Sequence, residues 1–165
     1  MSIADSMLPE FDQEMAGLRK VLERVPDGKS DWKPHEKSMP LARLATHLAD
    51  LPIWTTNALT KDVLEFTLPQ APHIVHGAKE RLELFDKNVK EARAALAAAK
   101  DADWPKTWTL KVNGKVAFAL PHAAVYRTSA MNHMIHHRAQ LGVYLRLRGV
   151  PLPFLYGPTA DEQMR

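Results

Sequence analysis

Apolar residues recur at helical spacing in the first part of the chain. Between residues 5 and 25 they fall three or four positions apart, which places them on one face of a helix. We therefore predict an amphipathic helix over 5–25 whose apolar face lies against a core. Its apolar positions are Met7, Leu8, Phe11, Met15, Leu18, Val21, Leu22 and Val25.

Three later segments carry the same period. A second helix is predicted over 40–60, with a kink or break at Pro52, because proline lacks an amide hydrogen and crowds the preceding turn. A third helix is predicted over 72–100, where the alanine-rich end has high helix propensity. A fourth is predicted over 121–148, with Pro121 at the position where a first helical turn tolerates proline.

One stretch before the fourth helix alternates instead of following the helical period. Residues 108–118 alternate around Asn113-Gly114, a pair typical of a two-residue β-hairpin turn. Residues 61–71 are predicted to be a connection without regular structure. The whole pattern predicts an all-α four-helix bundle with a small β-hairpin excursion before the last helix. At this length, residues 1–165 are expected to form a single domain.

Composition narrows the possible chemistry. The chain has no cysteine, which excludes disulfide scaffolds, thiolate metal sites and a cysteine nucleophile. Its 22 basic and 19 acidic residues give a net charge of +3 and are interspersed, so we expect no nucleic-acid partner. Apolar runs of about 18 residues are absent, and the acidic start lacks the pattern of a signal peptide. We therefore expect a cytoplasmic protein without a membrane partner.

Histidines carry the clearest chemical signal. His133 and His137 lie four residues apart in the predicted last helix, so both project from one face and can chelate one metal ion. His47 lies on the apolar stripe of the second helix, where it is either a core histidine or a third ligand. Burying three imidazoles without partners costs free energy, and a shared ion would remove that cost.

The other histidines are weaker candidates. His136 is expected near the polar margin of its helix, and His122 is expected in a solvated first turn. His73 and His76 are expected at the exposed start of the third helix. The His-Glu-x-x-His signature of zinc proteases is absent from the sequence, and so are the Glu-x-x-His pairs of di-iron bundles.

Four segments of the chain carry a family resemblance. They are Trp32-Lys-Pro-His-Glu-Lys-Ser-Met, Leu44-Ala-Thr-His47-Leu-Ala-Asp-Leu-Pro-Ile-Trp54, Asn132-His133-Met-Ile-His136-His137-Arg138-Ala-Gln140 and the tail from Pro153 to Glu162. Together they resemble the DinB/YfiT-like metal-dependent superfamily over nearly the whole chain. The resemblance implies a four-helix bundle in which His47, His133 and His137 hold a divalent metal ion, with zinc or nickel expected.

The same resemblance implies a range of activities. Members of the family include thiol-dependent S-transferases, a thiol-dependent isomerase and proposed hydrolases. It therefore implies a metal-dependent enzyme that activates water or a small thiol, acts on a small-molecule substrate and forms a homodimer. Asp50 lies three positions after His47, and Gln140 lies three positions after His137. Either side chain could orient its imidazole, and Asp50 could also act as a base.

Two other classes of function stay open at this point. A non-catalytic metal- or ligand-binding module would hold an ion without turnover, since no clear acid or base accompanies the histidines. A DNA-associated bundle is supported only by the basic pI and by Arg146 and Arg148 near the end of the last helix.

Arg138 is expected in an exposed salt bridge, and Trp54 and Tyr126 are expected in the core.

Overall fold

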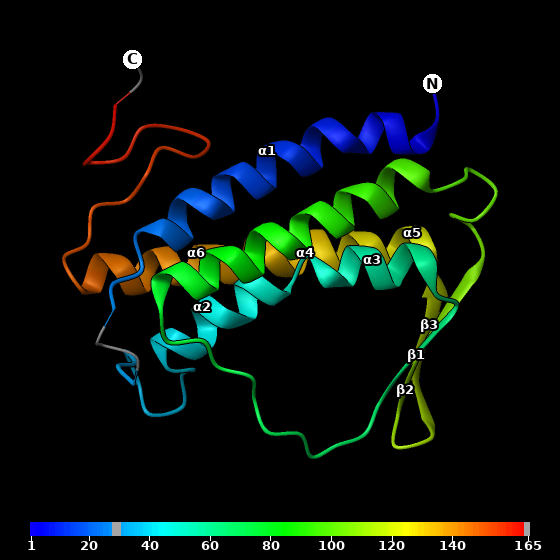
Figure 1. The fold of residues 1–165 in the computed structure, drawn as a ribbon, viewed down its shortest axis with the longest axis horizontal. Coiled ribbons are helices and arrows are strands. Elements are labelled where there is room, and N and C mark those ends of the chain that lie inside the picture. Colours follow the sequence, from blue (N-terminus) through cyan, green and yellow to red (C-terminus); the bar gives the residue numbers. More distant parts are fainter. Residues whose placement is uncertain (28–30, 164–165) are drawn as a thin grey trace.

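Helices make up most of the computed structural model, which describes residues 1–27 and 31–163. α1 and α4 run side by side across one face, with α2, α3 and the final helix behind them (Figure 1). The four predicted helices are present, and the helical bundle with a small β excursion is confirmed. The helices are α1 (Ile3–Glu23), α2 (Leu41–Asp50), α3 (Ile53–Thr60), α4 (Ala78–Ala98), α5 (His122–Val125), the π-helical segment η1 (Tyr126–Asn132) and α6 (His133–Leu147).

α1 begins at a reciprocal cap. The Asp5 amide donates to the Ser2 hydroxyl at 3.1 Å, and the Ser2 amide donates to the Asp5 carboxylate at 2.9 Å. These two bonds satisfy backbone donors that a helix start leaves free. The apolar face of α1 then enters the core, where Phe11, Leu18 and Leu22 are fully buried.

None of the helices in the described part of the chain combines the length and apolar character needed to cross a membrane.

The predicted break at Pro52 is confirmed. α2 ends at Asp50 and α3 begins at Ile53, so the second predicted helix is two helices that differ in direction. α2 packs against α6, and α3 packs against η1. The two helices on either side of the break therefore contact two successive segments of the last predicted helix.

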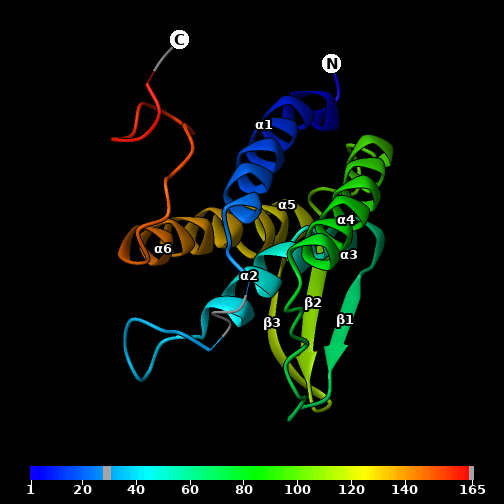
Figure 2. The same cartoon turned by 60° about the vertical axis from the view of Figure 1, so that its left-hand side comes forward.

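The small sheet has one more strand than predicted. β2 (Thr107–Val112) and β3 (Lys115–Pro121) form the expected antiparallel hairpin, whose turn has positive φ at Asn113 and Gly114. β1 (Val63–Phe66) pairs with β2 in parallel, within the stretch predicted to lack regular structure. The sheet lies at the end of the bundle where α3 and α5 meet (Figure 1 and Figure 2). A strand of four residues is too short for its period to show in the sequence.

The third helix begins later than predicted, at Ala78 instead of residue 72. Residues 71–77, the strap before α4, have no regular secondary structure and lie along α2. There the Val75 amide donates to the Thr46 hydroxyl at 2.9 Å. The same hydroxyl donates to the Val75 carbonyl at 3.2 Å. His73 and His76 therefore lie on an extended strap beside α2, and their predicted placement on a helix is wrong.

The last predicted helix contains a π-helical segment. Residues Tyr126–Asn132 form η1 between α5 and α6. Each hydrogen bond in a π-helix spans one residue more than in an α-helix. Residues on either side of η1 therefore do not point in the directions that an uninterrupted α-helix would give them. His122, in α5 before this segment, is buried against α3, with Nδ1 2.6 Å from the Ala58 carbonyl, and its predicted solvated position is wrong. Tyr126 is fully buried as predicted.

Arg138 is also placed differently from the prediction. Its side chain is 3% exposed and contacts the carboxylate of Glu14, itself 8% exposed, at 2.7 Å. Arg138 also donates to the Glu14 carbonyl at 3.2 Å and to the Tyr156 hydroxyl. Tyr156 in turn donates to the Glu14 carboxylate at 2.7 Å. A buried ion pair thus joins α6, α1 and the C-terminal tail, where an exposed salt bridge was predicted.

Removing one partner of this ion pair should destabilise the protein strongly. Arg138→Met leaves the Glu14 carboxylate buried without its charged partner, at a cost of about 3–5 kcal/mol in the free energy of unfolding. Urea unfolding of the metal-free protein measures this cost. The double variant Glu14→Leu/Arg138→Met removes both charges and should recover most of the loss.

The ion pair between Arg93 and Asp12 gives a matched control, because it joins α4 to α1 at the surface. Arg93→Met should change the unfolding midpoint only slightly, since solvent screens exposed pairs. Equal effects of Arg138→Met and Arg93→Met would contradict a structural role for the buried pair.

Candidate metal centre

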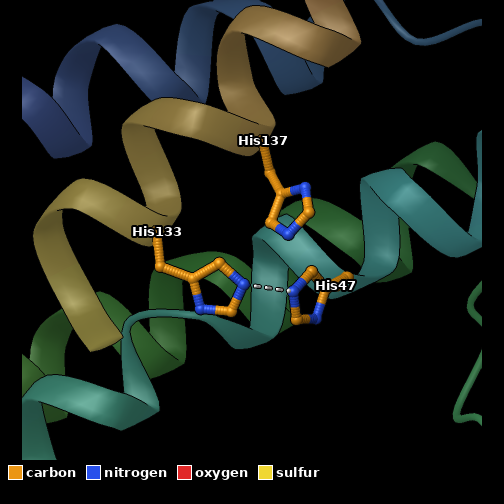
Figure 3. A group of neighbouring side chains, drawn as sticks. All are labelled: His47, His133 and His137. Carbon is orange, nitrogen blue, oxygen red and sulfur yellow. Dashed lines mark hydrogen bonds between the residues drawn. The ribbon is translucent and has the colours of Figure 1, made fainter. Parts of the chain in front are cut away.

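Three partly buried histidines converge between the helices α2 and α6. His47 comes from α2, and His133 and His137 come from successive turns of α6 (Figure 3). The Nε2 atoms of His47 and His133 are 3.3 Å apart, and one ring nitrogen from each histidine lies within 4.8 Å of the others. The structure therefore brings together all three predicted ligands.

This spacing fits a shared metal ion. Zinc–nitrogen bonds of about 2.0–2.1 Å in a tetrahedral site place two ligand nitrogens about 3.4 Å apart. The 3.3 Å between His47 and His133 matches that edge, and the separations from His137 are at most 4.8 Å, within about 1.4 Å of it. Imidazole donors suit zinc, nickel, copper and iron, so the residues form a group that could bind a divalent metal ion.

Hydrogen bonds at the outer ring nitrogens orient two of the imidazoles. His137 Nδ1 lies 2.7 Å from the side-chain oxygen of Gln140, and His133 Nδ1 lies 3.3 Å from the Ser129 carbonyl. Both partners are acceptors, so each Nδ1 carries the hydrogen and each Nε2 presents its lone pair to the centre. Gln140 therefore lies where the sequence placed it, as the partner of His137. Asp50 instead contacts His73, with its Oδ2 3.4 Å from His73 Nδ1.

The electrostatics keep these imidazoles neutral. Burial lowers the pKa of His47 to about 4, and His137, His133 and Arg43 reinforce the shift. Burial also lowers the pKa of His133 and of His137, with neighbouring histidines adding to each shift. Only the neutral imidazole has a lone pair for a metal ion. At neutral pH the group is therefore in its ligating form.

The three histidines line a cavity of about 360 Å³. This volume is typical of small-molecule sites, which are roughly 300–1,000 Å³. The helices α2 and α6 and the extended strap before α4 form its walls. The lining residues are Met39, Arg43, His47, Asp50, Pro72, His73, His133 and His137.

Sequence reasoning missed part of this cavity. It did not name Arg43, which lies four residues before His47, so helical spacing places Arg43 on the same face of α2 as His47 and the nominated Asp50. His73 had no such signal, because it reaches the cavity from the extended strap. His136 is exposed and outside the three-histidine group, as expected.

The fold and the three-histidine group together define this protein as a helical bundle with a potential metal-binding site. A family model for the DinB family matches residues 1–164. The uncharacterised protein YrdA of Bacillus subtilis (strain 168) is 23% identical over 159 residues, which span 96% of this chain and 90% of YrdA. The chain belongs to the DinB family, and the resemblance noted in the sequence is confirmed.

Solved structures share this fold. A DinB-like protein from Bacillus cereus ATCC 10987 superposes with a TM-score of 0.71 at 20% identity, covering 92% of this chain and 97% of that one. The DinB-like protein YjoA from Bacillus subtilis superposes with a TM-score of 0.66 at 17% identity, covering 97% of this chain and 99% of that one. At these identities the likeness establishes the fold.

Acidification should destabilise the metal-free protein through these histidines. The pKa of His47 is about 4 in the folded protein and 6.5 ordinarily, so the unfolded chain binds more protons between these values. Stability therefore falls as the pH falls from about 6.5 toward about 4. The urea midpoint at pH 7.5 and at pH 5 measures the loss.

The variant His47→Ala should show a smaller difference between the two midpoints, because it removes the largest of these shifts. His136→Ala removes an exposed neighbour that adds only a smaller part to the pKa shifts of His133 and His137, so it should keep most of the wild-type difference. Identical pH dependence in His47→Ala and the wild type would contradict this assignment.

Proposed function

We propose that this protein is a metal-dependent enzyme that uses one divalent ion, held by His47, His133 and His137, to activate water or a small thiol. One observation carries the proposal: three neutral imidazoles converge within 4.8 Å on the wall of a cavity large enough for a small molecule. The ion in this proposal is zinc or nickel, and imidazole donors suit both.

The chemistry follows from the donor set. A divalent ion held by three neutral imidazoles keeps its full charge and lowers the pKa of a water or thiol bound beside them, which makes either one nucleophilic near neutral pH. The chain provides the orientation, since Gln140 and the Ser129 carbonyl hold His137 and His133 with their lone pairs turned inward.

Asp50 and His73 are suited to remove the proton that the nucleophile loses. Asp50 lines the same cavity as His47 and lies one helical turn along α2 from it. Its carboxylate contacts His73, whose side chain is 60% exposed. In this proposal Asp50 accepts the proton, and His73 passes it to solvent.

Metal content is the first test. Protein purified without a histidine tag and supplied with zinc or nickel should carry about one ion per chain by elemental analysis. His137→Ala should lose that ion, because two imidazoles bind far more weakly than three. His136→Ala removes the adjacent exposed histidine and should retain it. Equal metal content in the two variants, or none in the wild type, would refute the centre.

The nucleophile is identified on the cobalt-loaded protein. Addition of 2-mercaptoethanol should produce a near-ultraviolet sulfur-to-cobalt charge-transfer band in the wild type and in His136→Ala. Hydrolysis of p-nitrophenyl acetate, compared between loaded and metal-free protein, tests water in the same preparations. A loaded protein that neither binds thiol nor accelerates hydrolysis would favour the alternative, a module that holds metal without turnover.

A further inference from the structure

Arg43 differs from every other arginine in residues 1–27 and 31–163. Each of the others contacts a partner within the protein, whereas the structure gives Arg43 no hydrogen bond, ion pair or contact with an aromatic ring within those residues. Carboxylates pair with Arg19, Arg24, Arg93, Arg127, Arg138 and Arg146, a backbone carbonyl accepts from Arg81, and Arg148 lies over the ring of Trp32.

The position of Arg43 is as unusual as its lack of a partner. It lies four residues before His47 on α2, so both side chains project from the same face of the helix. Four residues span about 6 Å along a helix axis. Arg43 is exposed, and it lines the cavity that contains the three histidines. An unpaired guanidinium therefore lies about one helical turn from the candidate metal centre.

The charges in the cavity are separated along α2. Among the described residues that line it, Asp50 is the only carboxylate. It lies seven residues beyond Arg43, about 10 Å along the helix axis, and it contacts His73. Arg43 is therefore not neutralised by Asp50. The cavity has a cationic end at Arg43, an acidic end at Asp50 and the imidazoles between them.

We propose that Arg43 binds a carboxylate of the substrate, about one helical turn from the reacting atom. The planar guanidinium matches the two oxygens of a carboxylate and can donate two parallel hydrogen bonds. One arginine also matches the single charge of that group. The substrate class is then a small molecule that carries a carboxylate a few bonds from its thiol or its reacting carbon. This inference rests on the proposed metal centre, which locates the reacting atom.

Two thiols of equal length test this subsite. Calorimetry measures the dissociation constants of 3-mercaptopropionate and the uncharged 3-mercaptopropanol for the zinc-loaded protein, and the cobalt band confirms that sulfur reaches the metal. The wild type should prefer the carboxylate by about tenfold, the size of a typical charge-assisted hydrogen bond. Arg43→Gln should lose this preference, while its metal content and its affinity for mercaptopropanol stay at wild-type values.

Two further variants separate charge from geometry. Arg43→Lys keeps the charge without the planar pair of donors and should retain only part of the preference. Lys115→Gln removes one positive charge at the hairpin, outside the cavity lining, and should retain all of it. A preference that survives in Arg43→Gln would show that the carboxylate binds elsewhere and would overturn the proposal.

A result in which neither thiol binds tests the activation of thiols separately from the carboxylate subsite. If zinc is present at one ion per chain and neither thiol binds, activation of thiols is wrong but the subsite can still be judged. Succinate is then compared with its uncharged diamide, and their difference in affinity must depend on Arg43 in the same way. If that difference is absent or independent of Arg43, the carboxylate subsite is wrong even though the metal centre stands.

Discussion

The buried ion pair between Arg138 and Glu14 determines which way α6 faces. Successive residues of a helix point about 100° apart, so anchoring Arg138 on α1 turns its neighbour His137 away from α1. α2 lies on that other side and presents His47. The pair is almost fully buried, which makes a misplaced rotation of α6 costly, because either charge alone would be buried without compensation. The orientation of His133 and His137 thus depends on the contact between Arg138 and Glu14, in which neither histidine takes part.

The other wall of the cavity depends on the backbone near Pro52 and Val75. The proline ends α2 directly after Asp50, so that helix presents Arg43, His47 and Asp50 before the chain changes direction. The paired hydrogen bonds between Thr46 and Val75 then hold the strap before α4 against α2. His73 reaches Asp50 from this strap. Two local features of the backbone therefore arrange polar groups on both sides of the imidazoles.

Sequence reasoning found the parts of the site that lie on regular helices. The four-residue spacing of His133 and His137, and the place of His47 on an apolar stripe, were sufficient to nominate the three histidines that the fold brings together. It missed β1, whose partner strand lies far away in the chain, and it began α4 six residues early. Arg138 was misplaced because its partner Glu14 lies 124 residues away, which no local pattern reveals. His122 was misplaced because a first helical turn was assumed to be solvated, whereas α5 packs against α3 and the Ala58 carbonyl.

The π-helical segment η1 also bears on how this chain tolerates changes of length. Its seven residues stand directly before His133, so losing or gaining one residue there would turn α6 by about 100° relative to the hairpin and α5. The hairpin turn at Asn113-Gly114 lies at the end of the sheet away from the helices, and its hydrogen bonds go to β1 and the residues just after it, not to α2 or α6. Relatives that retain all three histidines should therefore vary in length at this turn and keep a constant number of residues between Pro121 and His133.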